Sequence, residues 1–310
     1  MLLRQISPND AITLLVIAGL GKSAPILQDV QFYAKPGAAD SLKRKRTGTT
    51  NAIFRSVNDS NVATPPTNVY DPVAKKIISF DAKVDVVLED RNEDTNTELA
   101  EQTRLEAESA GYTLQEKIFE GSSANDPEEF DGIRAMVNVA WKKTTGGNGI
   151  VVPVGNSDAN VGAQQVFVEQ LLKFLAMVRG GAQYVYMNEY LKIRLISVAK
   201  NLGYYRQTKD ELGNLVDQIG NTTLRGAGYK EDGTPLLPFT ETVGAANNCS
   251  SMFAVRFGER ADFTALTSVG IKARYSGQIG NFIINNVNMD MAFALPNPPA
   301  LVQMQGFRLE

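Results

Sequence analysis

The sequence predicts an α+β fold in which one long, polar helix lies across an antiparallel sheet. Residues 76–90 alternate apolar and polar side chains, which is typical of a strand with one buried face. Residues 92–120 carry apolar side chains at helical spacing in a narrow stripe, so much of this helix is expected to be exposed. Residues 268–275 and 283–295 alternate again and add two long strands with a bend between them.

Composition limits the chemistry that the chain can carry. Its 310 residues suffice for one large or two modest domains, and 43% hydrophobic residues permit a substantial core. A net charge of −3 does not favour binding to nucleic acid or to anionic membranes as the main activity. The absence of histidine excludes Ser-His-Asp triads, Cys-His pairs and histidine-bound zinc. Cys249, the one cysteine, is expected to be a small buried apolar residue. These properties favour a structural role.

The first 27 residues are expected to form an N-terminal arm that carries a docking helix. Ser7, Pro8 and Asp10 match the N-cap, first-turn proline and capping-box positions ahead of the apolar run 11–20. This run is too short to span a bilayer, and its flanks do not fit a secretory signal. Gly21-Lys22-Ser23 is similar to the end of a P-loop, but Val16 stands where that motif needs its first glycine. A nucleotide hydrolase that uses Lys22 is the enzymatic alternative.

Residues 28–75 are interpreted as a long hairpin. Its predicted strands are 28–35 and 50–57, and its predicted tip is the basic run Lys43-Arg44-Lys45-Arg46. Four adjacent cations fit a solvated loop, a nucleic-acid patch, or a tip that meets an acidic patch on a neighbouring subunit. The run contains no aromatic residue on which a base could stack, so the third interpretation is preferred.

An acidic turn follows the long helix. Asp126, Glu128, Glu129 and Asp131 offer oxygen ligands to a divalent cation, or place negative charge beside a helix expected to begin near Phe130. The second interpretation is favoured.

The remaining elements are expected to form a second helix-rich unit and its return. Helices at 163–179 and 188–202 flank a buried strand at 184–187, and Asn188 is a candidate N-cap. Residues 210–233 are polar and glycine-rich and are expected to form turns. The apolar stretch 251–257 precedes the two long strands, and Pro296, Pro298 and Pro299 are expected to close the sheet before a short tail.

The order of these elements resembles the major capsid proteins of tailed bacteriophages, the HK97-fold family. The local match is Glu-Phe-Asp-Gly-Ile at 129–133 after a long, Glu-rich helix. The resemblance implies an HK97-like capsid fold with an N-terminal arm (1–27), an E-loop hairpin and its connection (28–75), a P-domain strand and spine helix (76–134), an A-domain (135–250), and P-domain return strands with a C-terminal tail (251–310).

The resemblance also implies a function. Pentamers and hexamers of the chain would tile an icosahedral shell around non-specifically bound double-stranded DNA, with scaffolding, portal and decoration proteins as further partners in a virion assembled in the bacterial cytoplasm. The alternative is an encapsulin-type shell that encloses cargo enzymes. No catalytic residue, cofactor, metal or membrane contact is expected. Some family members form isopeptide bonds, for which Lys43 and Lys45 are candidates without an identifiable partner asparagine.

The arm, the hairpin and the thin-striped helix are all expected to find burial on other copies of the chain. Candidate inter-subunit contacts are Lys43, Arg44, Lys45, Arg46, Phe32, Phe54, Glu101, Arg104 and Glu108.

Overall fold

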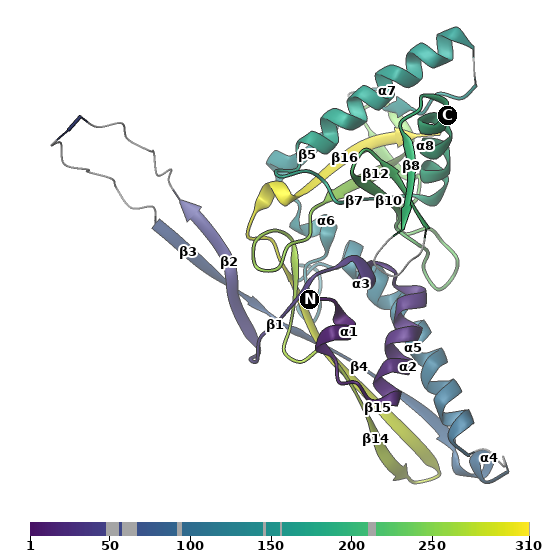
Figure 1. Ribbon diagram of the computed structural model, residues 1–310. Helices are drawn as coiled ribbons and strands as arrows, with labels where there is room; N and C mark the ends of the chain where they lie inside the picture. Colours follow the sequence, from purple (N-terminus) through teal and green to yellow (C-terminus); the bar gives the residue numbers. More distant parts are fainter. Residues whose placement is uncertain are drawn as a thin grey trace.

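The described residues form two β-sheets, a separate two-stranded ribbon and helices that cover the sheets (Figure 1). The computed structural model describes residues 1–47, 56–57, 67–91, 95–144, 147–155, 157–209 and 215–309. The helices in this part of the chain are α1 (Leu3–Ile6), α2 (Ala11–Ser23), α3 (Ile26–Asp29), α4 (Val86–Arg91), α5 (Thr95–Glu120), α6 (Ile133–Met136), α7 (Asp158–Ala176) and α8 (Glu189–Asn201), with 3-10 turns η1 (Val139–Trp141) and η2 (Pro298–Ala300). The strands are β1 (Phe32–Ala34), β2 (Ala39–Thr47), β3 (Thr67–Ala74), β4 (Lys76–Asp85), β5 (Lys142–Thr144), β6 (Ile150–Val151), β7 (Tyr184–Met187), β8 (Tyr205–Lys209), β9 (Leu215–Ile219), β10 (Thr222–Gly226), β11 (Glu241–Val243), β12 (Ala246–Val255), β13 (Thr264–Thr267), β14 (Ile271–Ile279), β15 (Phe282–Ala294) and β16 (Leu301–Arg308).

The five-stranded sheet is built around β15. This strand pairs antiparallel with β4, β14 and β13, and β1 extends the sheet parallel to β13. The alternation predicted for β4 is confirmed, because Ala82 and Val84 are buried while Asp81 and Lys83 are exposed. The strand ends at Asp85 rather than at residue 90. β15 begins opposite Asp85, so β4 has no ladder to continue there, and the Val87 N–H donates to Asp85 Oδ1 at 2.8 Å as α4 begins.

The long helix α5 lies along β4 and β15, and α2 packs on a second side of it (Figure 1). Leu99, Ala107, Leu114 and Ile118, all members of the predicted stripe, are buried. The contact with α2 is close, since a Cβ on Gly111 would lie 1.9 Å from Ser23 Oγ. The described part of α5 is therefore covered more fully than its thin stripe predicts.

The N-terminal residues pack on their own chain, which corrects the expectation that they pack on another copy. Val16, Leu20 and Leu27 lie in the core cluster that also contains α5 residues. The N-cap of α2 is Asp10 and not Ser7, because the Thr13 N–H donates to Asp10 Oδ1 at 2.8 Å. The Ser7 hydroxyl instead donates to the Leu3 carbonyl at the end of α1. A partner for the helix is thus already present in the monomer.

The ribbon differs from the predicted hairpin. Its strands are β2 and β3, paired antiparallel from Ala39–Ala74 to Thr47–Thr67, and it extends away from both sheets (Figure 1). The alternation seen at 28–35 instead reflects burial of Val30 and Phe32 in the body. Of the predicted strand 50–57, only Ser56 and Val57 are described, and they are not in a strand. The charged run 43–46 shows no alternation of apolar and polar residues by which a strand could be recognised from the sequence.

The nine-stranded sheet has the order β5-β16-β12-β7-β10-β9-β8, with β11 paired to β12 and β6 paired to β16. Residues 301–308, expected to be a short tail, form β16 inside this sheet. The segment 251–310 therefore supplies strands to both sheets. The turn-rich region 210–233 contains β9 and β10, of which β10 runs parallel to β7.

Two helices pack on the nine-stranded sheet in the second core cluster. The predicted cap of α8 is confirmed, because the Tyr190 N–H donates to Asn188 Oδ1 at 2.9 Å. Helix α7 begins at Asp158, earlier than predicted, after an N-cap at Ser157. Leu172, expected on its buried face, is 40% exposed. Aromatic rings connect the two halves of the molecule, with the Phe119 and Tyr186 centroids 5.7 Å apart and those of Phe257, after β12, and Phe263, before β13, also 5.7 Å apart.

Candidate assembly surface

The basic run that the sequence places at a hairpin tip lies within β2. In the ladder, Lys43, Arg44, Lys45 and Arg46 stand opposite Asp71, Tyr70, Val69 and Asn68. β2 and β3 form a sheet of two strands, separate from the other sheets. An isolated two-stranded ribbon is at best marginally stable in water, so further contacts are expected to stabilise it.

The predicted contact residue Phe32 cannot serve as an exposed contact in the described structure. Phe32 is completely buried in β1, within the core of its own chain, so its side chain offers no surface to another subunit. This corrects the sequence-based assignment, which placed Phe32 on the hairpin. Phe54 lies outside the described residues.

Glu101, Arg104 and Glu108 belong to one ion-pair cluster on α5. Arg104 Nη2 lies 2.6 Å from Glu101 Oε1, and its Nη1 lies 3.5 Å from Glu108 Oε2. Lys22 of α2 reaches the same glutamate, with its Nζ 2.7 Å from Glu108 Oε1. The hydrogen bond from Arg104 lowers the pKa of Glu101. Exposed ion pairs contribute little to stability, so the cluster can exchange partners at little cost.

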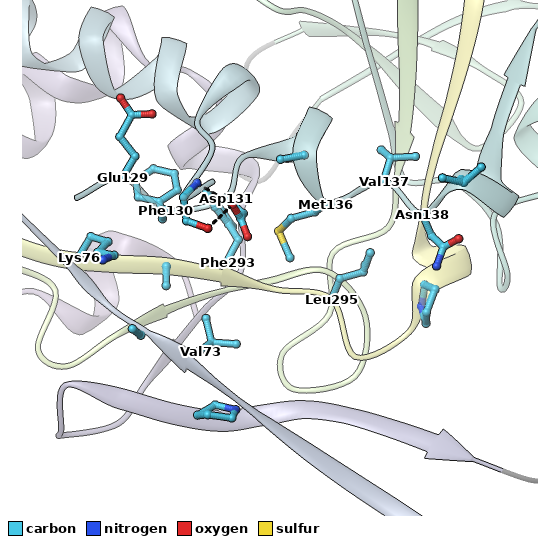
Figure 2. Close-up of a pocket in the computed structure, with 17 residues that line it drawn as sticks. Val73, Lys76, Glu129, Phe130, Asp131, Met136, Val137, Asn138, Phe293 and Leu295 are labelled. Carbon is cyan, nitrogen blue, oxygen red and sulfur yellow. Dashed lines mark hydrogen bonds between the residues drawn. The ribbon is translucent and has the colours of Figure 1, made fainter. Parts of the chain in front are cut away.

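A groove of about 600 Å³ lies where the root of the ribbon meets the body (Figure 2). Val73 of β3 lines one side and Met136 lines another, over a floor that includes Phe130, Phe293 and Leu295. The Phe130 and Phe293 rings meet edge to face, with centroids 5.5 Å apart. The floor is therefore apolar, which suits packing of apolar side chains better than acid–base chemistry.

Three of the four carboxylates of the acidic turn next to this groove, those of Asp126, Glu129 and Asp131, have protein donors. Glu129 pairs with Lys117, and this hydrogen bond raises the pKa of Lys117. Asp131 Oδ1 accepts from the Ser123 N–H at 2.8 Å and from the Ser123 hydroxyl at 2.7 Å. Asp126 accepts from the Glu128 N–H at 2.9 Å, and the next helix begins only at Ile133. The described residues contain no cluster of three or more Asp, Glu, His or Cys that would hold a metal ion.

The remaining candidates for chemistry also have structural roles. Gly21, Lys22 and Ser23 form the last turn of α2 rather than a phosphate-binding loop, and Lys22 pairs with Glu108. Cys249 is fully buried, as expected, and burial raises the pKa of its thiol, which keeps it protonated. Among the described helices, none has both the length and the apolar character needed to cross a membrane.

Sequence reasoning missed two polar clusters that join distant segments. Asp29 accepts from Arg225 Nη2 at 2.8 Å and from the Tyr186 hydroxyl at 3.0 Å, which ties α3 to the nine-stranded sheet. Lys75, between β3 and β4, contacts the segment that precedes β2. No local pattern indicates either cluster, because the partners of Asp29 lie 157 and 196 positions away along the chain.

Comparison with known proteins identifies the fold. No protein-family model matches the sequence, and no curated protein sequence is significantly similar to it. The structure is similar to that of the holo-SrpI encapsulin complex from Synechococcus elongatus, with a TM-score of 0.63 at 11% identity over 92% of this chain and 87% of that one. It is also similar to the capsid of a native GTA particle, with a TM-score of 0.57 at 13% identity over 97% and 92% of the two chains. The capsid of Myoviridae phage XM1 matches with a TM-score of 0.52 at 11% identity over 89% of both chains. The chain therefore has the α+β HK97-like fold shared by phage capsids and encapsulins.

Proposed function

We propose that the chain is a structural shell protein, and specifically the major capsid protein of a tailed bacteriophage. The observation that carries this proposal is the ribbon β2–β3, which extends from the body as a sheet of its own (Figure 1). The nine residues of β2 span about 30 Å, which is long for a ribbon in which the described residues supply two strands. A second copy of the chain is the partner that a shell supplies, and repetition of one interface produces closed rings.

We infer further that the ribbon of one copy lies against α5 of its neighbour. Lys43–Arg46 bring four cations to β2, whereas Glu98 and Glu101 are exposed carboxylates on α5. Opposite charge would orient the two copies, while apolar contacts would supply most of the affinity. Pentamers and hexamers would follow from this contact, as in the resemblance to capsid proteins. Packaged double-stranded DNA would be bound non-specifically.

An encapsulin-type shell is the second candidate. It is favoured by the match to the SrpI encapsulin complex, whose TM-score of 0.63 exceeds that of the two capsids reported above. The Phe130-Asp131-Gly132 step after the long helix favours the phage capsid instead. The two candidates share the outer shell and differ in its contents.

Electron microscopy and the native mass of the purified chain test the shell function. We expect closed particles, either from the chain alone or with a co-expressed scaffolding protein. Dispersed monomers under all of these conditions would refute the proposal. Nuclease-protected DNA in the particles would support the capsid, whereas a co-purified cargo protein without DNA would support the encapsulin.

Charge reversal tests the ribbon contact. Lys43→Glu with Lys45→Glu should reduce particle yield at least tenfold if β2 meets the acidic face of α5. The matched control, Lys142→Glu with Arg206→Glu, makes the same change in net charge at two exposed positions of the nine-stranded sheet. An equal loss of particles in both variants would contradict a specific contact by β2.

A further inference from the structure

The ribbon is joined to the body through two short connections. Residues 35–38 lead from β1 into β2, and Lys75 alone separates β3 from β4. At these connections the chain passes from the five-stranded sheet into the ribbon and back again. The direction of the ribbon is therefore decided by a handful of residues.

The side chain of Lys75 binds the opposite connection. Its ammonium donates to the Lys35 carbonyl, to the Gly37 carbonyl at 3.0 Å and to the Ser268 hydroxyl at 3.3 Å. An ammonium has three protons, and these three acceptors occupy all of them. The Lys75 N–H also donates to the Ala38 carbonyl at 2.8 Å. One residue thus holds the two roots of the ribbon together.

Ser268 connects this cluster to the body. It lies in the loop between β13 and β14, and its N–H donates to Asp290 Oδ1 on β15 at 2.9 Å. The Ser268 hydroxyl also contacts Asp290 Oδ2 and lies 3.2 Å from the Gly37 carbonyl. The chain of contacts runs from the root of the ribbon, through Lys75 and Ser268, to the central strand of the sheet.

The cluster is buried and charged. Lys75 is only 8% exposed, and this burial lowers its pKa, an effect that Asp290 and Asp40 partly offset. Asp40, at the start of β2, is 4% exposed and pairs with Lys35 at 3.1 Å. Because a buried charge is costly unless its partners are in place, only a narrow set of ribbon directions satisfies Lys75.

We propose that Lys75 is a positioning residue that fixes the direction in which the ribbon leaves the body before any other subunit is bound. Only the consequence of this inference rests on the proposed shell function. That consequence is that a ribbon held in one direction binds the neighbouring copy without losing conformational freedom on binding. The positioning itself is a property of the single subunit.

The experiment measures the distance between spin labels on the ribbon and on the body in the dispersed full-length chain. Labels are attached at Arg46→Cys on β2 and at Ser79→Cys on β4, in a Cys249→Ala background that removes the native thiol. We expect one narrow distance distribution for the parent chain. Lys75→Met keeps an unbranched side chain, shorter by one atom, and removes the three donors, and we expect the width of the distribution at least to double.

The controls separate positioning from general damage. Lys83→Met removes an exposed lysine from the neighbouring strand β4, and we expect the parent distribution to be retained. Ser268→Ala removes the link to the body while leaving the charge of Lys75, so it provides a second test if Lys75→Met does not fold. The proposal would be overturned if Lys75→Met and Ser268→Ala, or whichever of the two folds, kept the distance distribution of the parent chain.

Particle assembly is then measured separately. If the parent chain forms shells, Lys75→Met should reduce their yield at least tenfold, while Lys83→Met should not. Unchanged yield with a broadened ribbon would overturn the inferred consequence for assembly. If the parent chain forms no shells, the proposed function fails, but the distance measurement still decides the role of Lys75.

Discussion

The bridge between α3 and the nine-stranded sheet makes a sharp prediction about stability. Asp29 is 7% exposed, and its carboxylate accepts from Arg225 Nε at 3.1 Å, from Arg225 Nη2 at 2.8 Å and from the Tyr186 hydroxyl at 3.0 Å. Asp29→Asn keeps the shape of the side chain but removes its charge and turns an amide N–H₂ or a single carbonyl toward Arg225. The partly buried guanidinium then loses the charge of Asp29.

The expected loss follows from the burial of both partners. Removing one member of a buried ion pair costs about 3–5 kcal/mol. The Arg225 side chain keeps 27% of its surface exposed, so water can solvate it partly, and the expected loss lies near the lower end, about 3 kcal/mol. Tyr186→Phe removes one hydrogen bond to a charged acceptor and should cost about 1.5 kcal/mol. The double variant should cost less than the sum of the two, by about 1 kcal/mol, because both changes act on the same carboxylate.

The assay is denaturant unfolding of the dispersed full-length chain, followed by circular dichroism. The matched control is Asp232→Asn, an aspartate in an exposed turn, whose effect on stability should be small. A loss below about 1 kcal/mol for Asp29→Asn, or strict additivity with Tyr186→Phe, would refute the reasoning that this bridge is a single buried unit.

Three further predictions concern other buried contacts. Burial, with help from Asp29, raises the pKa of Tyr186 well above its ordinary value, so above pH of about 10 the unfolded chain loses a proton that the folded chain keeps. The free energy of unfolding should therefore fall above this pH by up to about 1.4 kcal/mol per pH unit from this group. Tyr186→Phe should reduce this dependence on pH in unfolding experiments from pH 9 to 11. Gly111→Ala places its new Cβ against Ser23, so it should lower the free energy of unfolding by about 1–3 kcal/mol and speed hydrogen exchange in α2. The control Gly162→Ala adds its Cβ in open space on α7, so it should be neutral or stabilising. Thr103→Val should cost about 1–3 kcal/mol in denaturant unfolding, because the buried Asn285 amide loses the Thr103 Oγ1 acceptor that lies 2.9 Å away. Adding Asn285→Leu should recover most of this loss, and no recovery would contradict this account.

Local sequence patterns predicted the helices and strands in which buried and exposed residues alternate regularly. The alternation in β4 and the helical spacing in α5 and α8 follow directly from which face meets the core. The cap at Asn188 was equally predictable, because a capping hydrogen bond joins residues two positions apart.

Pairing between distant segments was not predictable in this way. β16 lies between β12 and β5, yet its sequence shows nothing of which strands flank it. β2 is charged throughout its second half and pairs only within the ribbon sheet, so neither side chains nor spacing mark it as a strand. The bridge of Asp29 and the cluster around Lys75 depend on side chains that meet only after folding. The candidate surface was therefore predictable in kind, as a basic projecting hairpin, but not in its strand bounds or its anchoring.

The continuity of β3 and β4 through one residue has a mechanical consequence. A neighbour that pulls on the ribbon pulls directly on β4, whose ten paired positions along β15 lie parallel to the load. Such a ladder is strained in shear, so its hydrogen bonds share the force instead of opening one after another. In a container under internal pressure, tension between subunits would thus reach the five-stranded sheet of each body without first stretching a loop.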